Sequence, residues 1–103
     1  GRDGTGFNRG SNIPLGLVVA GVNMVAVDSV ASYLMGFDPQ KLIYLRVAAE
    51  AGVGTNDLSR LNVYSSEGGS LAPCADLERW RATPPFRVIS GVIPGSVDPD
   101  CYR

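Results

Sequence analysis

The feature that most constrains this chain is an apolar run from Ile13 to Val27, IPLGLVVAGVNMVAV. The run is 15 residues long, contains a proline, two glycines and an asparagine, and is followed by Asp28. A helix that spans a membrane needs about 20 uninterrupted apolar residues, and a signal peptide starts at the N-terminus behind basic residues. The run predicts neither of these. It predicts a strand at 15–22, apolar without alternation and covered on both faces, followed by a helix.

That helix is predicted over 24–35. Asn23 is a favoured N-cap residue, and Gly36 can adopt the left-handed conformation that ends a helix. Apolar side chains lie almost all round the helix, and its other positions are mostly small. A helix with this pattern is buried on most of its sides.

A second helix is predicted from Pro39 to Ala51. Asp38 followed by proline is typical of a helix start, with an N-cap and then the first helical position. Gly52 stands where a C-terminal glycine is expected. Arg46 and Glu50 share one narrow polar stripe, so this helix is also expected to be largely buried, with one solvent-exposed edge.

The remaining elements are shorter. They are a turn at 52–57, a helical turn at 56–59, a strand at 61–65, a turn at 67–70, an amphipathic helix at 73–81 anchored by Leu77 and Trp80, and a strand at 86–90. The chain thus divides into a glycine-rich loop at 1–14, a strand–helix–helix–strand core at 15–67 and an irregular segment at 68–103.

These elements predict a small α/β domain with a buried strand, two mostly buried helices and one or two further short strands. Two or three strands make a poor doubly covered sheet by themselves. We therefore expect the chain to be part of a larger α/β sheet domain and to hide its apolar surface only against a partner.

The charges argue against several functions. Ten acidic and nine basic residues give a net charge of -1, and no stretch builds the basic field that nucleic-acid binding needs. The chain has no histidine, which removes the usual general base and the commonest metal ligand. Cys74 and Cys101 belong to no Cys-x-x-Cys pair, so no metal or cofactor held by this chain is expected. Two free thiols in a cytoplasmic protein are favoured over a disulfide.

Asp28 is the most interesting candidate residue, because it is the one acid on a helix that otherwise has the pattern of a core element. We expect it to be buried and to accept hydrogen bonds from the backbone within residues 3–12. The alternative is a metal ligand or proton-handling acid that faces the loop Gly4–Gly10, whose N–H groups could hold an anion. The candidate ligand-binding residues are Asp3, Gly4, Gly6, Arg9 and Asp28. No base–nucleophile pair can be assembled from the chain.

Several features between Gly16 and Glu67 occur in the order and spacing of a known family. They are a hydrophobic strand, the stretch NMVAVD at 23–28, the stretch LMGFDP at 34–39, the glycines 52 and 54, and a closing strand. Together they resemble the C-terminal half of domain-of-unknown-function family 362, a prokaryotic family often found next to ferredoxin-type iron–sulfur segments. The loop DGTG at 3–6 resembles the glycine-rich loop that precedes the strand in that family.

The resemblance implies a partner more than it implies an activity. The family's upstream half and its ferredoxin cysteines are absent from these 103 residues, so an iron–sulfur cluster would belong elsewhere in a full-length protein. The family usually has Asp-Pro where this chain has Asn23 and Met24, so an acid with a chemical role there would be lost. We expect a structural or interaction half of a larger enzyme or redox protein. Its partner would be the upstream half of the same protein or a second copy.

Overall fold

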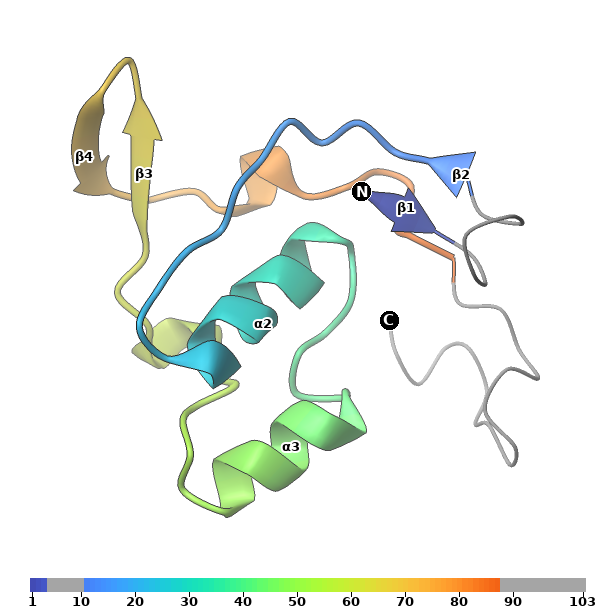
Figure 1. The fold of residues 1–103 in the computed structure, drawn as a ribbon, viewed down its shortest axis with the longest axis vertical. Helices are drawn as coiled ribbons and strands as arrows, with labels where there is room; N and C mark the ends of the chain where they lie inside the picture. The colour runs from blue at the N-terminus through green and yellow to red at the C-terminus, as the bar shows by residue number, and fades with distance from the viewer. Residues whose placement is uncertain (4–10, 88–103) are drawn as a thin grey trace.

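Two helices, α2 (Met24–Leu34) and α3 (Ile43–Glu50), form the centre of the molecule in the computed structural model, which describes residues 1–3 and 11–87 (Figure 1). Two antiparallel strand pairs accompany them in this part of the chain: β1 (Arg2–Asp3) with β2 (Ser11–Asn12), and β3 (Tyr64–Glu67) with β4 (Ser70–Pro73). The chain is therefore a small mixed α/β domain, which confirms the predicted fold class. Neither of the two helices is long and apolar enough to cross a membrane.

The hydrophobic core is formed where α2, α3 and the segment 81–86 meet. Its buried members are Val25, Phe37, Leu42, Leu45, Ala82 and Phe86. Leu45 is 1% exposed and Phe86 3% exposed. Side chains far apart in the sequence therefore close one core, and the C-terminal part of the described chain is needed to complete it.

Helix α2 begins and ends where the sequence predicts. Its N-cap Asn23 accepts a hydrogen bond from the Ala26 N–H at 3.0 Å. At the other end Gly36 has a φ of 98°, and its N–H donates to the Tyr33 carbonyl while the Phe37 N–H donates to the Ser32 carbonyl. This pair of bonds satisfies carbonyls that the helix leaves open.

Helix α3 is shorter than predicted, because it begins at Ile43 and not at Pro39. Asp38 does not cap a helix: its carboxylate accepts from the Gln40 N–H at 3.0 Å, and its carbonyl accepts from the Lys41 N–H. These bonds close a separate turn at 38–41. Leu42 follows in an extended conformation and is 8% exposed. Helix α3 therefore begins directly after Leu42, whose side chain is buried in the core.

The predicted end of α3 is confirmed, but its predicted burial is wrong. Gly52 has a φ of 76°, and the Gly52 and Val53 N–H groups donate to carbonyls of the last helical turn. Leu45 is the one buried residue within the helix. Three of its large apolar side chains are about half exposed: Ile43 (49%), Tyr44 (54%) and Val47 (55%). No described element covers this outer side of the helix.

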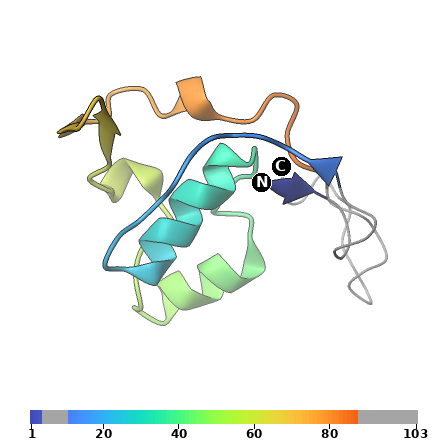
Figure 2. The same cartoon turned by 45° about the horizontal axis from the view of Figure 1, so that its top comes forward.

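The predicted buried strand at 15–22 is not a strand. In the described part of the chain, no main-chain group of residues 14–22 makes a hydrogen bond, and Val18 and Val22 are 95% and 109% exposed. This stretch, the open segment (residues 15–22), runs past α2 as a connection from β2 (Figures 1 and 2). The pattern identifies residues suited to a sheet, but a sheet needs neighbouring strands, and neither strand pair lies beside this segment.

Strands β3 and β4 do pair, and the turn that joins them brings them together. Gly68 and Gly69 both have positive φ, at 69° and 91°, which is the conformation of a tight two-residue hairpin turn. The predicted turn at 67–70 is confirmed. The preceding strand lies at 64–67 and not at 61–65, because the turn sets the register, with Glu67 opposite Ser70. The second strand was not predicted.

Most of the remaining predicted elements are shorter in the structure than the sequence predicts. The helix at 73–81 is a single 3₁₀ turn, Glu78–Trp80. The helical turn at 56–59 is a 3₁₀ turn at Leu58–Arg60, capped by Asp57. Residues 86 and 87 belong to no strand, and residues 88–90 of the strand predicted at 86–90 lie outside the described residues. One-turn elements carry too little apolar periodicity to be placed from sequence.

Candidate functional site

Asp28 is exposed on the surface of α2, so the prediction that it is buried against residues 3–12 is wrong. Asp28 follows Met24 by four positions, and Met24 is 74% exposed. Residues four apart lie on one side of a helix, so both face outward, whereas Val25 and Ser29 face the core. A carboxylate in this position keeps its water and needs no backbone donors from a loop.

Of the other candidate ligand-binding residues, the structure describes Asp3. Asp3 lies in β1, opposite Ser11 of β2. Gly4, Gly6 and Arg9 lie outside the described residues. Within residues 1–3 and 11–87, no group of three or more cysteine, aspartate or glutamate side chains is placed to bind a metal ion.

Of the two cysteines, the structure describes one. Cys74 has a free, half-buried thiol, and Cys101 lies outside the described residues. The Cys74 N–H donates to the Val63 carbonyl at 2.8 Å, which extends the pairing of the β3–β4 hairpin by one bond. Within the described residues, Cys74 therefore has a structural role beside the hairpin.

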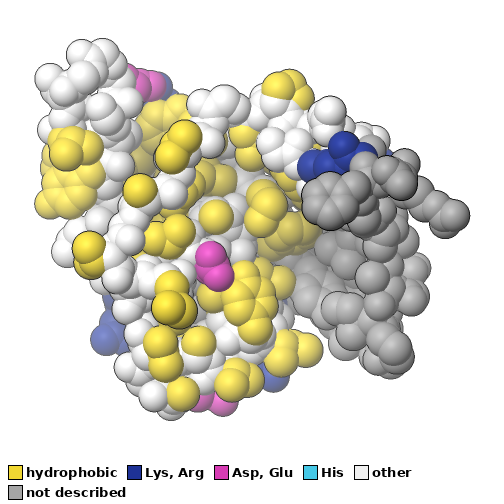
Figure 3. All heavy atoms as spheres, viewed as in Figure 1, with side chains coloured by type: hydrophobic (Ala, Val, Ile, Leu, Met, Phe, Trp, Pro, Cys, Tyr) yellow, Lys and Arg dark blue, Asp and Glu magenta, His cyan; other side chains and the backbone are white. Residues whose placement is uncertain are grey.

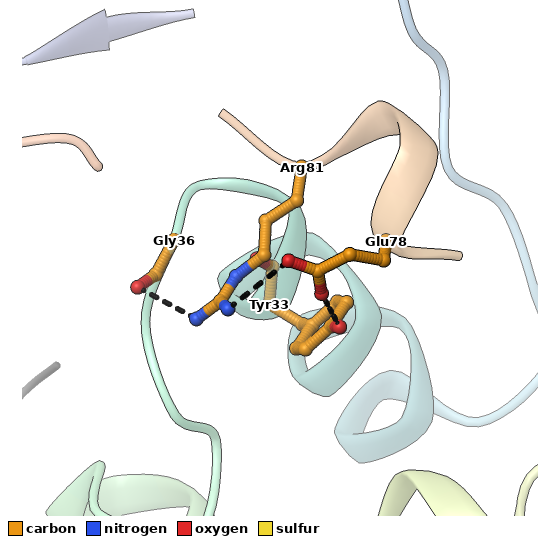
Figure 4. A network of polar contacts seen from close by, with 4 residues as sticks. All are labelled: Tyr33, Gly36, Glu78 and Arg81. Atoms are coloured by element: carbon orange, nitrogen blue, oxygen red, sulfur yellow. Dashed lines mark hydrogen bonds and ion pairs between the residues drawn. The ribbon is translucent and has the colours of Figure 1, made fainter. Parts of the chain in front are cut away.

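The densest polar network joins the end of α2 to the 3₁₀ turn at 78–80 (Figure 4). The Tyr33 hydroxyl donates to the Glu78 carboxylate. The Arg81 guanidinium donates to the Tyr33 carbonyl at 3.2 Å and to the Gly36 carbonyl at 3.0 Å. It also lies 4.5 Å from the centre of the Tyr33 ring and 3.7 Å from Glu78. One side chain thus contacts the backbone, an aromatic ring and an acid.

This network closes the C-terminal end of α2. Besides the bonds from Arg81, the Ala82 N–H donates to the Leu34 carbonyl at 2.7 Å and the Phe86 N–H to the Met35 carbonyl at 2.9 Å. The carbonyls of residues 33–36 are therefore all bonded to the capping segment (residues 81–86). The sequence analysis assigned no role to Arg81. The signal it missed is general, because the last carbonyls of every helix need donors.

Two open hollows lie beside α2 in the described part of the chain. One, of about 600 Å³, is bordered by Asn23, Asp57 and Arg60, and the other, of about 370 Å³, by Tyr33, Asp57 and Arg81. Their polar atoms already hold the fold together. The Asn23 amide donates to the Val53 carbonyl at 2.9 Å, and one Asp57 oxygen accepts from both the N–H and the hydroxyl of Ser59.

Two titratable groups at these hollows, Tyr33 and Asp57, are not suited to proton exchange near neutral pH. The hydrogen bond to the Glu78 carboxylate raises the pKa of Tyr33 above its usual value of 10.0, and burial adds to this shift. The hydrogen bonds from Ser59 lower the pKa of Asp57 below its usual value of 3.8. Both pKa values therefore move away from the range in which a general acid or base works best.

The described residues also leave a large amount of apolar side-chain surface exposed to solvent. Exposed large apolar side chains occur on the open segment, at the start of α2 and on α3: Leu17, Val18, Val22, Met24, Ile43, Tyr44 and Val47. Figure 3 shows hydrophobic side chains gathered over α2 and α3 on the viewed face, with few charges between them. Large exposed apolar patches mark interaction sites in soluble proteins.

Comparison of the chain with models of protein families, with curated proteins and with solved structures finds no match. Membership of domain-of-unknown-function family 362 therefore stays a prediction, and the function is inferred from the residues of the chain itself.

Proposed function

We propose that this chain is an interaction half of a larger α/β protein, an enzyme or redox protein of the family 362 type, whose chemistry is carried by another segment. The observation that supports this most is the open segment, where Val18 and Val22 are 95% and 109% exposed. Burying one valine side chain fully contributes about 1.5–3 kcal/mol. A partner that covered both, together with the outer side of α3, would gain several times that amount.

The polar groups support the same proposal. Tyr33, Glu78 and Arg81 are engaged in closing α2, and Asn23 joins the start of α2 to the backbone of Val53. Within the described residues these groups stabilise a fold and leave no nucleophile beside a base. We propose that the substrate and any cofactor are bound by the partner half, with this chain providing packed helices.

The experiment is a reconstitution from two polypeptides: the 103-residue chain and the segment encoded upstream of it in the same gene product. Alone, the chain should bind an apolar dye and self-associate in light scattering. Mixed with the upstream segment, it should form a 1:1 complex and lose its dye binding, because the apolar surface is then covered.

Matched variants identify the surface. Val22→Asp places a charge on the open segment and should abolish the complex. Leu71→Asp is the control, since Leu71 is also strongly exposed, at 76%, but lies on the polar β3–β4 hairpin. A chain that is monomeric alone at high concentration, unfolds sharply and binds no dye would refute the proposal.

A further inference from the structure

We infer that the capping segment (residues 81–86) is a replaceable strap. It opens as one unit while α2 and α3 stay packed together, and the site that it leaves accepts the same segment from a second copy of this chain. The inference is independent of the proposed function, because it concerns the end of α2 and not the open segment.

The capping segment is held on the molecule as a short peptide ligand would be. The Arg81 side chain and the Ala82 and Phe86 N–H groups donate hydrogen bonds to the carbonyls of residues 33–36. These donors all reach one turn of chain at the end of α2, where the helix leaves its last carbonyls open. One small site therefore receives the backbone and the arginine of the whole segment.

Two apolar side chains anchor the same segment. Ala82 is 8% exposed and Phe86 3% exposed, and both belong to the hydrophobic core. The Phe86 ring also lies against Gly1, where a Cβ would be 2.5 Å from the ring. Thr83 and Pro84, between the two anchors, are exposed. Recognition through a few buried anchors with exposed residues between them is typical of a bound peptide.

The two prolines make the segment stiff. Pro84 and Pro85 each have a fixed φ and no N–H group. Pro85 packs on Gly36, because a Cβ there would lie 2.5 Å from the Pro85 side chain. A stiff segment cannot bend freely between its anchors, so we expect Ala82 and Phe86 to leave their places together.

The chain that leads to the capping segment is weakly attached. Arg79 pairs with Glu67 at the surface, with side chains 51% and 62% exposed, and such pairs contribute little to stability. The exposed residues of this stretch are Ala75, Asp76, Glu78 and Arg79. The stretch can therefore act as a tether that changes its path when the strap opens.

The rest of the core lies within α2, α3 and their connection. Val25, Phe37, Leu42 and Leu45 are its buried members outside the capping segment, and the two helices contact each other directly. Opening of the strap therefore leaves the packing between α2 and α3 in place.

A second copy of the chain carries the segment that the structure shows in this site. When two copies exchange capping segments, each site keeps the same hydrogen bonds and the same buried side chains, and only the path of the tether changes. Exchange of an identical element is a low-cost route to a dimer. The closed form is favoured in dilute solution, because a tethered segment has a high effective concentration at its own site.

The opening is tested by amide hydrogen exchange on the intact chain. The Ala82 and Phe86 amides should be equally protected, and at least about tenfold less protected than the amides in the middle of α2. Their exchange should also depend less on denaturant, because a local opening exposes less surface than global unfolding. Protection and denaturant dependence equal to those of α2 would overturn the inference, since the strap would then open only when the whole chain unfolds.

The exchange between copies is tested by mixing two full-length variants. Phe86→Ala weakens the strap and leaves its site intact. Gly36→Ala keeps the strap but crowds the site, since the new Cβ would lie 2.7 Å from the Pro85 Cα. The mixture should form a 1:1 complex, followed by fluorescence anisotropy, at least about tenfold more tightly than either variant associates with itself. Association through the exposed apolar surface would be the same in all three samples.

A milder variant and a peptide guard against loss of folding. Arg81→Met weakens the strap without leaving a cavity, and can replace Phe86→Ala in the mixture. A labelled peptide of residues 79–87 should bind the Arg81→Met chain more tightly than the wild-type chain, and should gain no affinity for Gly36→Ala. Variants that keep their circular dichroism but bind neither the complementary chain nor the peptide would overturn the inference and leave the proposed function untouched.

Discussion

Helices α2 and α3 end in the same way, yet they have different surroundings. Each is followed by a glycine with positive φ, Gly36 and Gly52, and each has the same two backbone bonds across its last turn. The capping segment (residues 81–86) then covers the end of α2. The end of α3 is open, and a Cβ on Gly52 would meet no atom within 4 Å.

The starts of the two helices differ as well. Asn23 caps α2 with its side chain, whereas Leu42 precedes α3 without a side-chain cap. Helix α2 contains five buried residues and α3 one. The comparison teaches that a local signal decides where a helix ends, while contacts far away in the sequence decide whether that end is buried. It also shows which helix is covered by other parts of the chain and which leaves large apolar side chains exposed.

The largest expected effect comes from Gly36→Ala. The new Cβ would lie 2.7 Å from the Cα of Pro85, and the residue would keep an unfavourable φ. Left-handed backbone costs a non-glycine residue about 1–2 kcal/mol, and overpacking costs about 1–3 kcal/mol more. We expect a loss of about 3 kcal/mol in the free energy of unfolding, measured by denaturant titration.

Gly52→Ala is the matched control, since it has the same backbone strain without the overlap. It should cost about 1 kcal/mol. Equal losses for the two variants would contradict the view that the capping segment closes α2 tightly in solution.

The second effect concerns the start of α2. Asn23→Ala removes both the cap to Ala26 and the bond to the Val53 carbonyl, and should cost about 2 kcal/mol. Asn23→Asp keeps a capping oxygen but has no donor for Val53. It should cost about 1 kcal/mol, and an unchanged stability would show that the amide contact to Val53 contributes nothing.

Much of the helical part could be predicted from the sequence, because its signals are local. Asn23, Gly36 and Gly52 each act within one turn of backbone, and their predicted roles are confirmed. Gly68 and Gly69 likewise act locally, and the hairpin turn predicted from them is confirmed. Such positions depend on backbone conformation, which a few adjacent residues decide.

The rest could not be predicted, because it depends on distant contacts. Residues 15–22 have the composition of a buried strand, but pairing requires other strands, and composition does not say whether the chain provides them. Asp28 was expected to be buried because its helix is apolar on most sides, yet helices are covered only where another element lies. The role of Arg81 depends on a helix end 45 or more positions earlier.

The third prediction examines that long-range contact. Arg81→Met keeps an apolar stem near Tyr33 but removes the bonds to the Tyr33 and Gly36 carbonyls, and should cost about 1.5 kcal/mol. Arg79→Met is the control: Arg79 pairs with Glu67 at the surface, with side chains 51% and 62% exposed. Exposed pairs contribute about 0–1 kcal/mol, so the control should lose less. The reverse order would show that Arg81 does not hold the end of α2.

The smallest effect is expected at the start of α3, with Asp38→Ala. If Asp38 were the N-cap of a helix from Pro39, its loss would cost about 1 kcal/mol and unwind the first turn of that helix. Among the described residues its carboxylate bonds only to the Gln40 N–H, in a turn that the backbone bond from Lys41 also closes. We therefore expect a loss of about 0.5 kcal/mol, at the low end for a single hydrogen bond. Backbone chemical shifts should show helix at 43–50 in both proteins and none at 39–42. Helical shifts at 39–42 that disappear in the variant would place the start of α3 at Pro39 after all, and the two helices would then begin alike as well as end alike.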